Sequence, residues 1–110
     1  MQKLFLSFIA ASILCFVGFP TATQAQSDAA KLYKTNCALC HAADGSGDSP
    51  SGKALHAKEL RSEEVQKQSD AALSEAITKG KGKMPAFGAK IKPDDVRNLV
   101  AYLRELSKQK

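Results

Sequence analysis

The side chains best suited to chemistry in this sequence are scarce: it contains three Cys, two His and two Met. Two of the cysteines stand in the run Cys37-Ala38-Leu39-Cys40-His41, in which a histidine directly follows a C-x-x-C pair. Such a pair can belong to a zinc centre, a thioredoxin-like redox site, a structural disulfide or a covalently attached haem. The rest of the sequence discriminates among these four kinds of site.

Haem attachment fits this run best. A closed zinc site needs four ligands, and only His41 and His56 are available besides the two thiols. A redox pair needs a βαβ pattern, and no alternating β-branched strands are evident. A disulfide between Cys37 and Cys40 would close too short a loop to stabilise much. Two thiols at this spacing can instead reach the two vinyl groups on one porphyrin edge, with His41 as a ligand to the iron. We therefore expect one haem c, bound through Cys37 and Cys40.

A six-coordinate haem iron needs a second protein ligand, and Met84 is the main candidate. It stands in the segment 80–88, which is rich in Gly and Lys, whereas a core methionine usually belongs to a helical apolar stripe. Pro85 favours an extended backbone at Met84, which would hold the thioether on a strap. We expect His41 and Met84 to ligate the iron; His56, a lone histidine in a polar loop, is the competing ligand.

The first 25 residues resemble an export signal. Lys3 is the only charge before residue 28, and an apolar stretch extends from Leu4 to Phe19. We expect cleavage after Ala25, which leaves a domain at residues 26–110 in the periplasm. The alternative is a retained membrane anchor, although the apolar stretch is short for a spanning helix.

The remaining domain is small and poor in large apolar side chains. Burial in such a domain barely exceeds the roughly 1.5 kcal/mol per residue that ordering the chain costs. Composition therefore predicts a prosthetic group, a metal, disulfides or oligomerisation.

Helices are predicted to position these residues. The first covers roughly residues 28–39, capped by Ser27 or Asp28, and the stretch 42–58 reads as a loop because it is rich in glycine. A short helix is predicted after Ser62. The face of the first helix repeats at steps of three and four and comprises Ala30, Tyr33, Cys37 and Cys40.

Two further helices are predicted towards the C-terminus. One covers residues 70–79, is capped by Ser69 or Asp70 and ends at Gly80; its inward residues are Leu73, Ala76 and Ile77. The other begins at Pro93. Its apolar stripe has a 3.6-residue period and comprises Val96, Leu99, Val100, Leu103 and Leu106.

In this order of motifs the sequence resembles the class I c-type cytochromes, over nearly all of residues 26–110. The resemblance lies in the run from Cys37 to His41, in Lys83-Met84-Pro85 and in the closing helix from Val96 to Leu106. It is strongest to compact bacterial monohaem domains, including those associated with terminal oxidases. It implies an all-α fold, the small cytochrome c fold, with three to four helices wrapped around one covalently attached haem.

The resemblance also implies finer contacts. The first and last helices should cross, so that Tyr33 and Tyr102 meet. A backbone carbonyl in the loop after the haem motif should accept a hydrogen bond from His41, with Pro50 as the candidate. One departure is Lys92, which stands where the family commonly has a hydroxyl or acidic residue before the last helix; this weakens the cap.

Ligation by His41 and Met84 leaves no open position for a substrate. We therefore expect a soluble one-electron carrier between respiratory or other redox partners, with no small-molecule substrate and no enzymatic activity. The alternative is a haem enzyme, or a protein reactive with gas or peroxide, in which Met84 is displaced.

The basic charge, a net +5, indicates the kind of partner. No acidic residue lies between Glu75 and Asp94, and this interval is expected to form a docking rim for acidic redox proteins. An ordinary solvated lysine face is the alternative. Nucleic-acid binding is disfavoured because no aromatic-studded basic groove is evident, and membrane contact requires a retained signal. The lysines of this cluster are Lys79, Lys81, Lys83, Lys90 and Lys92.

Overall fold

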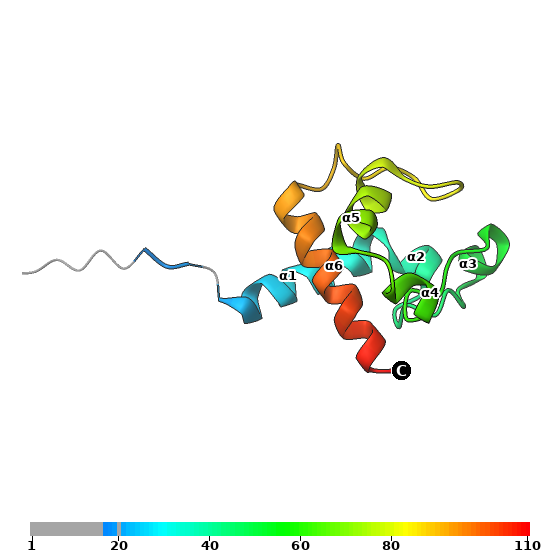
Figure 1. Ribbon diagram of the computed structural model, residues 1–110, viewed down its shortest axis with the longest axis horizontal. Helices are drawn as coiled ribbons and strands as arrows, with labels where there is room; N and C mark the ends of the chain where they lie inside the picture. Colours follow the sequence, from blue (N-terminus) through cyan, green and yellow to red (C-terminus); the bar gives the residue numbers. More distant parts are fainter. Residues whose placement is uncertain (1–16, 20) are drawn as a thin grey trace, which may run out of the picture.

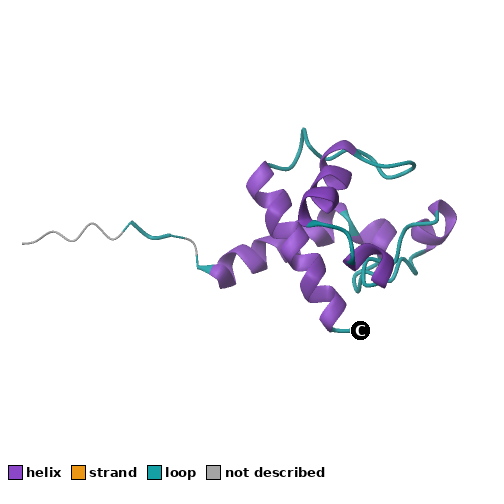
Figure 2. Ribbon diagram, in the orientation of Figure 1, coloured by secondary structure: helices purple, strands orange, loops and turns teal. Residues whose placement is uncertain are grey.

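The computed structural model describes residues 17–19 and 21–110, which fold into helices joined by loops (Figures 1 and 2). Most of the predicted export signal, residues 1–16 and 20, lies outside the described residues. In the described part, β pairing is limited to one isolated bridge, and no helix is both long and apolar enough to cross a membrane. The helices are α1 Ala22–Asn36, α2 Ala38–His41, α3 Pro50–Leu55, α4 Glu63–Gln66, α5 Asp70–Lys79 and α6 Pro93–Lys108.

The last helix, α6, is the centre of the core. Its predicted apolar stripe is confirmed, because all five residues of the stripe are buried. The helices α1 and α5 pack against α6 (Figure 1). As expected, the rings of Tyr33 and Tyr102 meet, with centroids 5.3 Å apart. The other buried apolar side chains of the core are Leu60, Val65, Leu73, Ile77 and Ile91.

Serine side-chain caps mark where α4 and α5 begin, whereas α6 begins without one. The Ser62 hydroxyl accepts a hydrogen bond from the amide of Val65, and the Ser69 hydroxyl accepts one from the amide of Ala72. The sequence predicted a short helix after Ser62 and a cap at Ser69 or Asp70, and the structure shows that Ser69 is the cap. At the start of α6, Lys92 provides no side-chain cap, which confirms the weakened cap expected there.

The prediction of a first helix over residues 28–39 was wrong at both ends. The helix α1 begins at Ala22, because its first turns lie along α6, where Ala22 and Ala25 line a shallow groove with Ala101. It ends at Asn36, and the φ of −115° at Cys37 separates it from α2. Tertiary contact therefore lengthens one end, while a backbone break shortens the other.

The loop prediction for residues 42–58 was also wrong, because α3 lies within it. Pro50 occupies the first turn of α3, and the Ser49 hydroxyl caps it by accepting a hydrogen bond from the amide of Gly52. Gly45 and Gly47 do form turns, with φ of 80° and 76°. Gly52 instead lies inside the helix, where a Cβ would overlap the carbonyl oxygen of Cys40.

Candidate functional site

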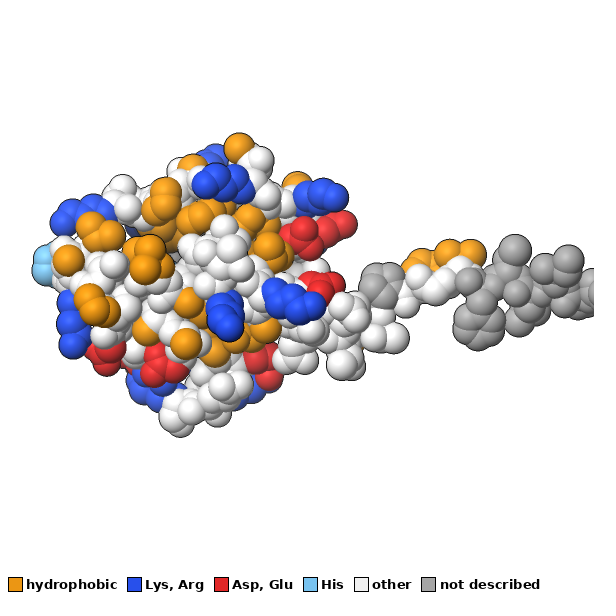
Figure 3. Space-filling view, turned by 180° about the vertical axis from the view of Figure 1, so that it is seen from behind, with side chains coloured by type: hydrophobic (Ala, Val, Ile, Leu, Met, Phe, Trp, Pro, Cys, Tyr) orange, Lys and Arg blue, Asp and Glu red, His pale blue; other side chains and the backbone are white. Residues whose placement is uncertain are grey.

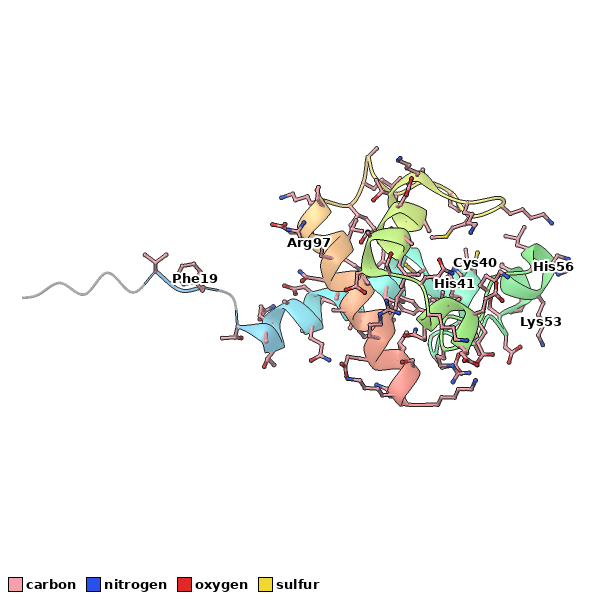
Figure 4. The ribbon with its side chains drawn as sticks, in the orientation of Figure 1. Phe19, Cys40, His41, Lys53, His56 and Arg97 are labelled. Carbon is pink, nitrogen blue, oxygen red and sulfur yellow. The ribbon has the colours of Figure 1, made fainter. Side chains whose placement is uncertain are left out.

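The short helix α2 carries three of the predicted site residues. Cys37 directly precedes it, and Cys40 and His41 form its last turn; Figure 4 shows Cys40 and His41 side by side. Both cysteines are half-buried free thiols. Burial raises the pKa of the Cys37 thiol to about 11, so this group is neutral at neutral pH.

The imidazole of His41 is held by the backbone. Its Nδ1 lies 2.9 Å from the carbonyl oxygen of Lys58. A carbonyl can only accept, so Nδ1 donates, and the lone pair on Nε2 is left for a metal. The choice of Pro50 as acceptor was wrong: Pro50 begins α3, and the loop reaches the imidazole only after that helix has ended.

The free carbonyl oxygens in and just after α2 receive hydrogen bonds from donors in the following loop and on α1. The Ser49 hydroxyl lies 2.6 Å from the Leu39 oxygen and 3.0 Å from the Cys40 oxygen. The amide of Gly47 donates to the His41 oxygen, and the Tyr33 hydroxyl donates to the oxygen of Ala42. A four-residue helix is not stable alone, so these bonds hold it in place.

Met84 lies on a separate strap after α5. Lys81 and Met84 exchange two backbone hydrogen bonds, of 3.0 and 3.1 Å, and Gly80 and Gly82 have positive φ. The strap is tied back to α5, because the amide of Phe87 donates to the oxygen of Ile77. The expectation of a non-helical strap at Met84 is therefore confirmed.

The α2 site and the strap meet the same core. Cys37 and Met84 are both half-buried against it, together with Phe87. His56, the competing ligand, is exposed at the end of α3, which projects outward in Figure 4. Leu39 is also turned outward, with 73% of its surface exposed.

Sequence reasoning missed Lys58, Ser49 and the Tyr33 hydroxyl. Lys58 acts through its backbone, so its side-chain type gives no signal. The pair Ser49-Pro50 did carry a signal, because serine followed by proline is a typical helix start. The neighbouring glycines favoured a loop prediction instead.

The lysine cluster is exposed but not uniform. Lys79 forms an ion pair with Glu75, with 2.9 Å between Nζ and Oε1, and this lowers the pKa of the Glu75 carboxyl. Among the described residues the four other lysines of the cluster form no ion pair, although Lys81, after Lys58, helps to lower the pKa of the Glu64 carboxyl. Figure 3 shows one face with scattered hydrophobic side chains and with Lys and Arg side chains both along its edge and within it. The unpaired lysines are Lys81, Lys83, Lys90 and Lys92.

These features fit a covalently held haem. Two thiols lie one helical turn apart, and the neighbouring imidazole has Nδ1 engaged with Lys58. A thioether stands on a strap against the same core, so the donors are those that haem c requires.

Known proteins share this pattern. Residues 24–103 match the family described as cytochrome c oxidase, cbb3-type, subunit III. The chain is 38% identical over 79 residues to cytochrome c6 from Aphanizomenon flos-aquae, covering 69% of this chain and 84% of the relative. It is 32% identical over 109 residues to cytochrome c6 from Gloeothece citriformis, covering 96% and 94%.

A solved structure agrees with these sequence relatives. The KustC0563 c-type cytochrome superposes with a TM-score of 0.65 at 34% identity, covering 71% of this chain and 95% of that one. The expected all-α cytochrome fold is thus confirmed. The chain belongs to the small class I c-type cytochromes, electron carriers with one covalently bound haem c.

Proposed function

We propose that this cytochrome binds haem through thioether bonds to Cys37 and Cys40, with His41 and Met84 as axial ligands, and that it is a one-electron carrier rather than an enzyme. The observation that carries the proposal is the hydrogen bond from His41 Nδ1 to the Lys58 oxygen, 2.9 Å long. It leaves Nε2 as the only imidazole nitrogen free to ligate iron.

Each of these residues has a distinct role in holding the haem. Haem c supplies a reversible one-electron change at its iron. The Lys58 carbonyl orients the His41 ring and makes it a better ligand. Met84, on a strap bonded to itself and to α5, would supply the second iron ligand and would keep water away from the iron. Ligands fixed in this way change little between the two oxidation states.

The competing function, reaction with a gas or peroxide, requires Met84 to leave. The bridge between Lys81 and Met84 and the bond from Phe87 to Ile77 both oppose movement of the strap. These contacts favour the carrier function.

Optical spectra of the purified holoprotein in both redox states test the proposal. We expect the spectrum of a covalent low-spin haem and the weak long-wavelength ferric band of methionine ligation. Met84→Ala should abolish that band and admit carbon monoxide, whereas the control His56→Ala should preserve the band. A band that survives in Met84→Ala, or rapid carbon monoxide binding by the unmodified protein at neutral pH, would contradict the ligand assignment.

The lysine cluster supports acidic redox proteins as partners. Lys81, Lys83, Lys90 and Lys92 are exposed and form no ion pair among the described residues, so their charge is available to another protein. Such a surface accelerates encounter without strong binding, which suits a transient electron-transfer complex.

The proposed location of the protein is the periplasm. The charge-poor apolar start of the chain supports it, and cleavage after Ala25 would leave Gln26 as the first residue. N-terminal sequencing of the protein from a membrane-free periplasmic extract tests this. A protein that starts at Met1 and stays with the membrane would indicate a retained anchor.

A further inference from the structure

The Ser49 hydroxyl lies between two helices. Its oxygen is 2.6 Å from the carbonyl oxygen of Leu39 and 3.0 Å from that of Cys40. On its other side the amide of Gly52 donates to it over 2.9 Å. One side chain therefore contacts the end of α2 and the start of α3.

These contacts assign two roles to one hydroxyl group. A hydroxyl has one proton, which Ser49 directs to the adjacent carbonyls of Leu39 and Cys40, and lone pairs, one of which accepts from Gly52. Ser49 is thus the N-cap of α3 and at the same time a donor to the free carbonyls of α2. Removing the hydroxyl takes the donor from the Leu39 and Cys40 oxygens and the acceptor from the Gly52 amide.

The packing at Gly52 shows how closely α3 approaches α2. Gly52 is buried, and a Cβ there would overlap the oxygen of Cys40 and would lie 2.5 Å from the oxygen of Gly47. The amide of Gly47 in turn donates to the oxygen of His41, over 2.8 Å. The first turn of α3 therefore packs against the backbone of Cys40, and the preceding loop residue Gly47 holds the oxygen of His41.

We propose that Ser49 is a positioning residue for the haem motif: it holds the backbone of Cys40 and His41 so that the His41 imidazole keeps its hydrogen bond to Lys58. This inference rests on the proposed ligation by His41. Ser49 does not touch the iron ligand itself; it acts through the carbonyls at the end of α2.

The matched control is Ser69, because it caps α5 with the same chemistry, at 3.1 Å from the amide of Ala72. Both Ser49→Ala and Ser69→Ala remove a serine N-cap, but only the first removes a donor to α2. Ser49→Asp keeps the capping acceptor and loses the donated proton, whereas Ser49→Thr keeps both roles.

The measurement is proton NMR of the ferric holoprotein. The His41 Nδ1 proton is shifted by the nearby paramagnetic iron, and its exchange with solvent reports how often the bond to Lys58 opens. We expect Ser49→Ala and Ser49→Asp to accelerate this exchange about five- to tenfold, the effect of losing one net hydrogen bond. The haem methyl shifts, which depend on the orientation of the imidazole plane, should change in the same two variants.

Ser69→Ala should leave both signals unchanged, and Ser49→Thr should restore them. If Ser49→Ala and Ser49→Asp leave the exchange at its unmodified rate, or if Ser69→Ala accelerates it equally, Ser49 has no positioning role. Should Ser49→Ala not yield holoprotein, Ser49→Asp against Ser49→Thr gives the same comparison. A failure of His41 ligation is distinguishable, because the unmodified protein would then show no shifted histidine Nδ1 proton.

Discussion

The rings of Tyr33 and Tyr102 lie with centroids 5.3 Å apart and planes inclined by 51°, where α1 crosses α6. The Tyr33 hydroxyl continues beyond this contact and donates to the oxygen of Ala42, 2.7 Å away. One side chain thus connects the crossing of the terminal helices to the residue directly after His41. Burial of its hydroxyl raises the pKa of Tyr33 well above its ordinary value and keeps the group a donor.

Replacing Tyr33 by phenylalanine should separate the contribution of the ring to stability from that of the hydroxyl. Tyr33→Phe keeps the aromatic contact but leaves the Ala42 carbonyl without its donor, so we expect a loss of about 1–3 kcal/mol in the free energy of unfolding. Denaturant unfolding of the holoprotein measures it. The control, Tyr102→Phe, leaves the bond to Ala42 intact, and an equal loss in both variants would show that this bond contributes nothing.

Gly80 should be required for the Met84 strap. A Cβ at Gly80 would lie 2.6 Å from the Met84 oxygen, whereas a Cβ at Gly82 meets nothing within 4 Å. Both residues have positive φ, 75° and 57°, so alanine is strained at either position, but only at Gly80 does it also meet the Met84 oxygen. We expect Gly80→Ala to weaken the ferric methionine band and to accelerate carbon monoxide binding, measured by stopped flow. Equal effects from Gly82→Ala would attribute the change to backbone strain alone.

Charge at the strap should control encounter with partners. Lys81→Gln combined with Lys83→Gln should slow electron transfer to an acidic partner several-fold at low salt and flatten its dependence on ionic strength. The control removes the same charge from Lys67 and Lys108, which are paired with Glu63 and Glu105. Rates are measured against salt with an acidic and a neutral partner. Identical slopes for the two double variants would exclude a local docking rim.

Asp44 should contribute to the loss of stability in acid. The Ser46 hydroxyl and amide, with a smaller effect from Arg61, hold the pKa of the Asp44 carboxyl below its ordinary value. A group whose pKa is lowered by folding stabilises the fold above its unfolded pKa, and that contribution disappears as the pH falls through the folded pKa.

Asp44→Asn should therefore destabilise the protein at neutral pH and cost progressively less as the pH falls through this acidic range. Unfolding midpoints across a pH series measure the difference between the two proteins. A difference that is constant with pH would mean that the Asp44 carboxylate has no role in it.

Much of the fold was predictable because side-chain patterns specify it locally. The stripe on α6, the caps at Ser62 and Ser69 and the stop at Gly80 each depend on residues within a few positions of one another. The start of α1 was not, because it depends on packing along α6 far away in the sequence. The loop prediction likewise failed at α3, because Gly52 permits close approach to Cys40 rather than a turn.

The site residues also fall into two groups: those identified by their side-chain types and those that act through the backbone. The sequence predicted Cys37, Cys40, His41 and Met84 because haem chemistry requires those side-chain types at that spacing, and their assignment as haem ligands remains a prediction. The backbone partners could not be predicted so well, since any residue has a carbonyl. Which one reaches His41 depends on the path of the chain after α3, and that path ends at Lys58.

Ala42 offers a route to a more heat-resistant protein. Its φ of 63° and ψ of 162° place it in a region nearly reserved for glycine, at a cost of about 1–3 kcal/mol for other residues. Glycine loses more chain entropy on folding, by about 0.4–1 kcal/mol, which is less than the strain it would relieve. Ala42→Gly should thus raise the melting temperature of the holoprotein in calorimetry while the Tyr33 hydroxyl keeps its acceptor. A lower melting temperature would show that the alanine side chain has a packing role that outweighs the strain.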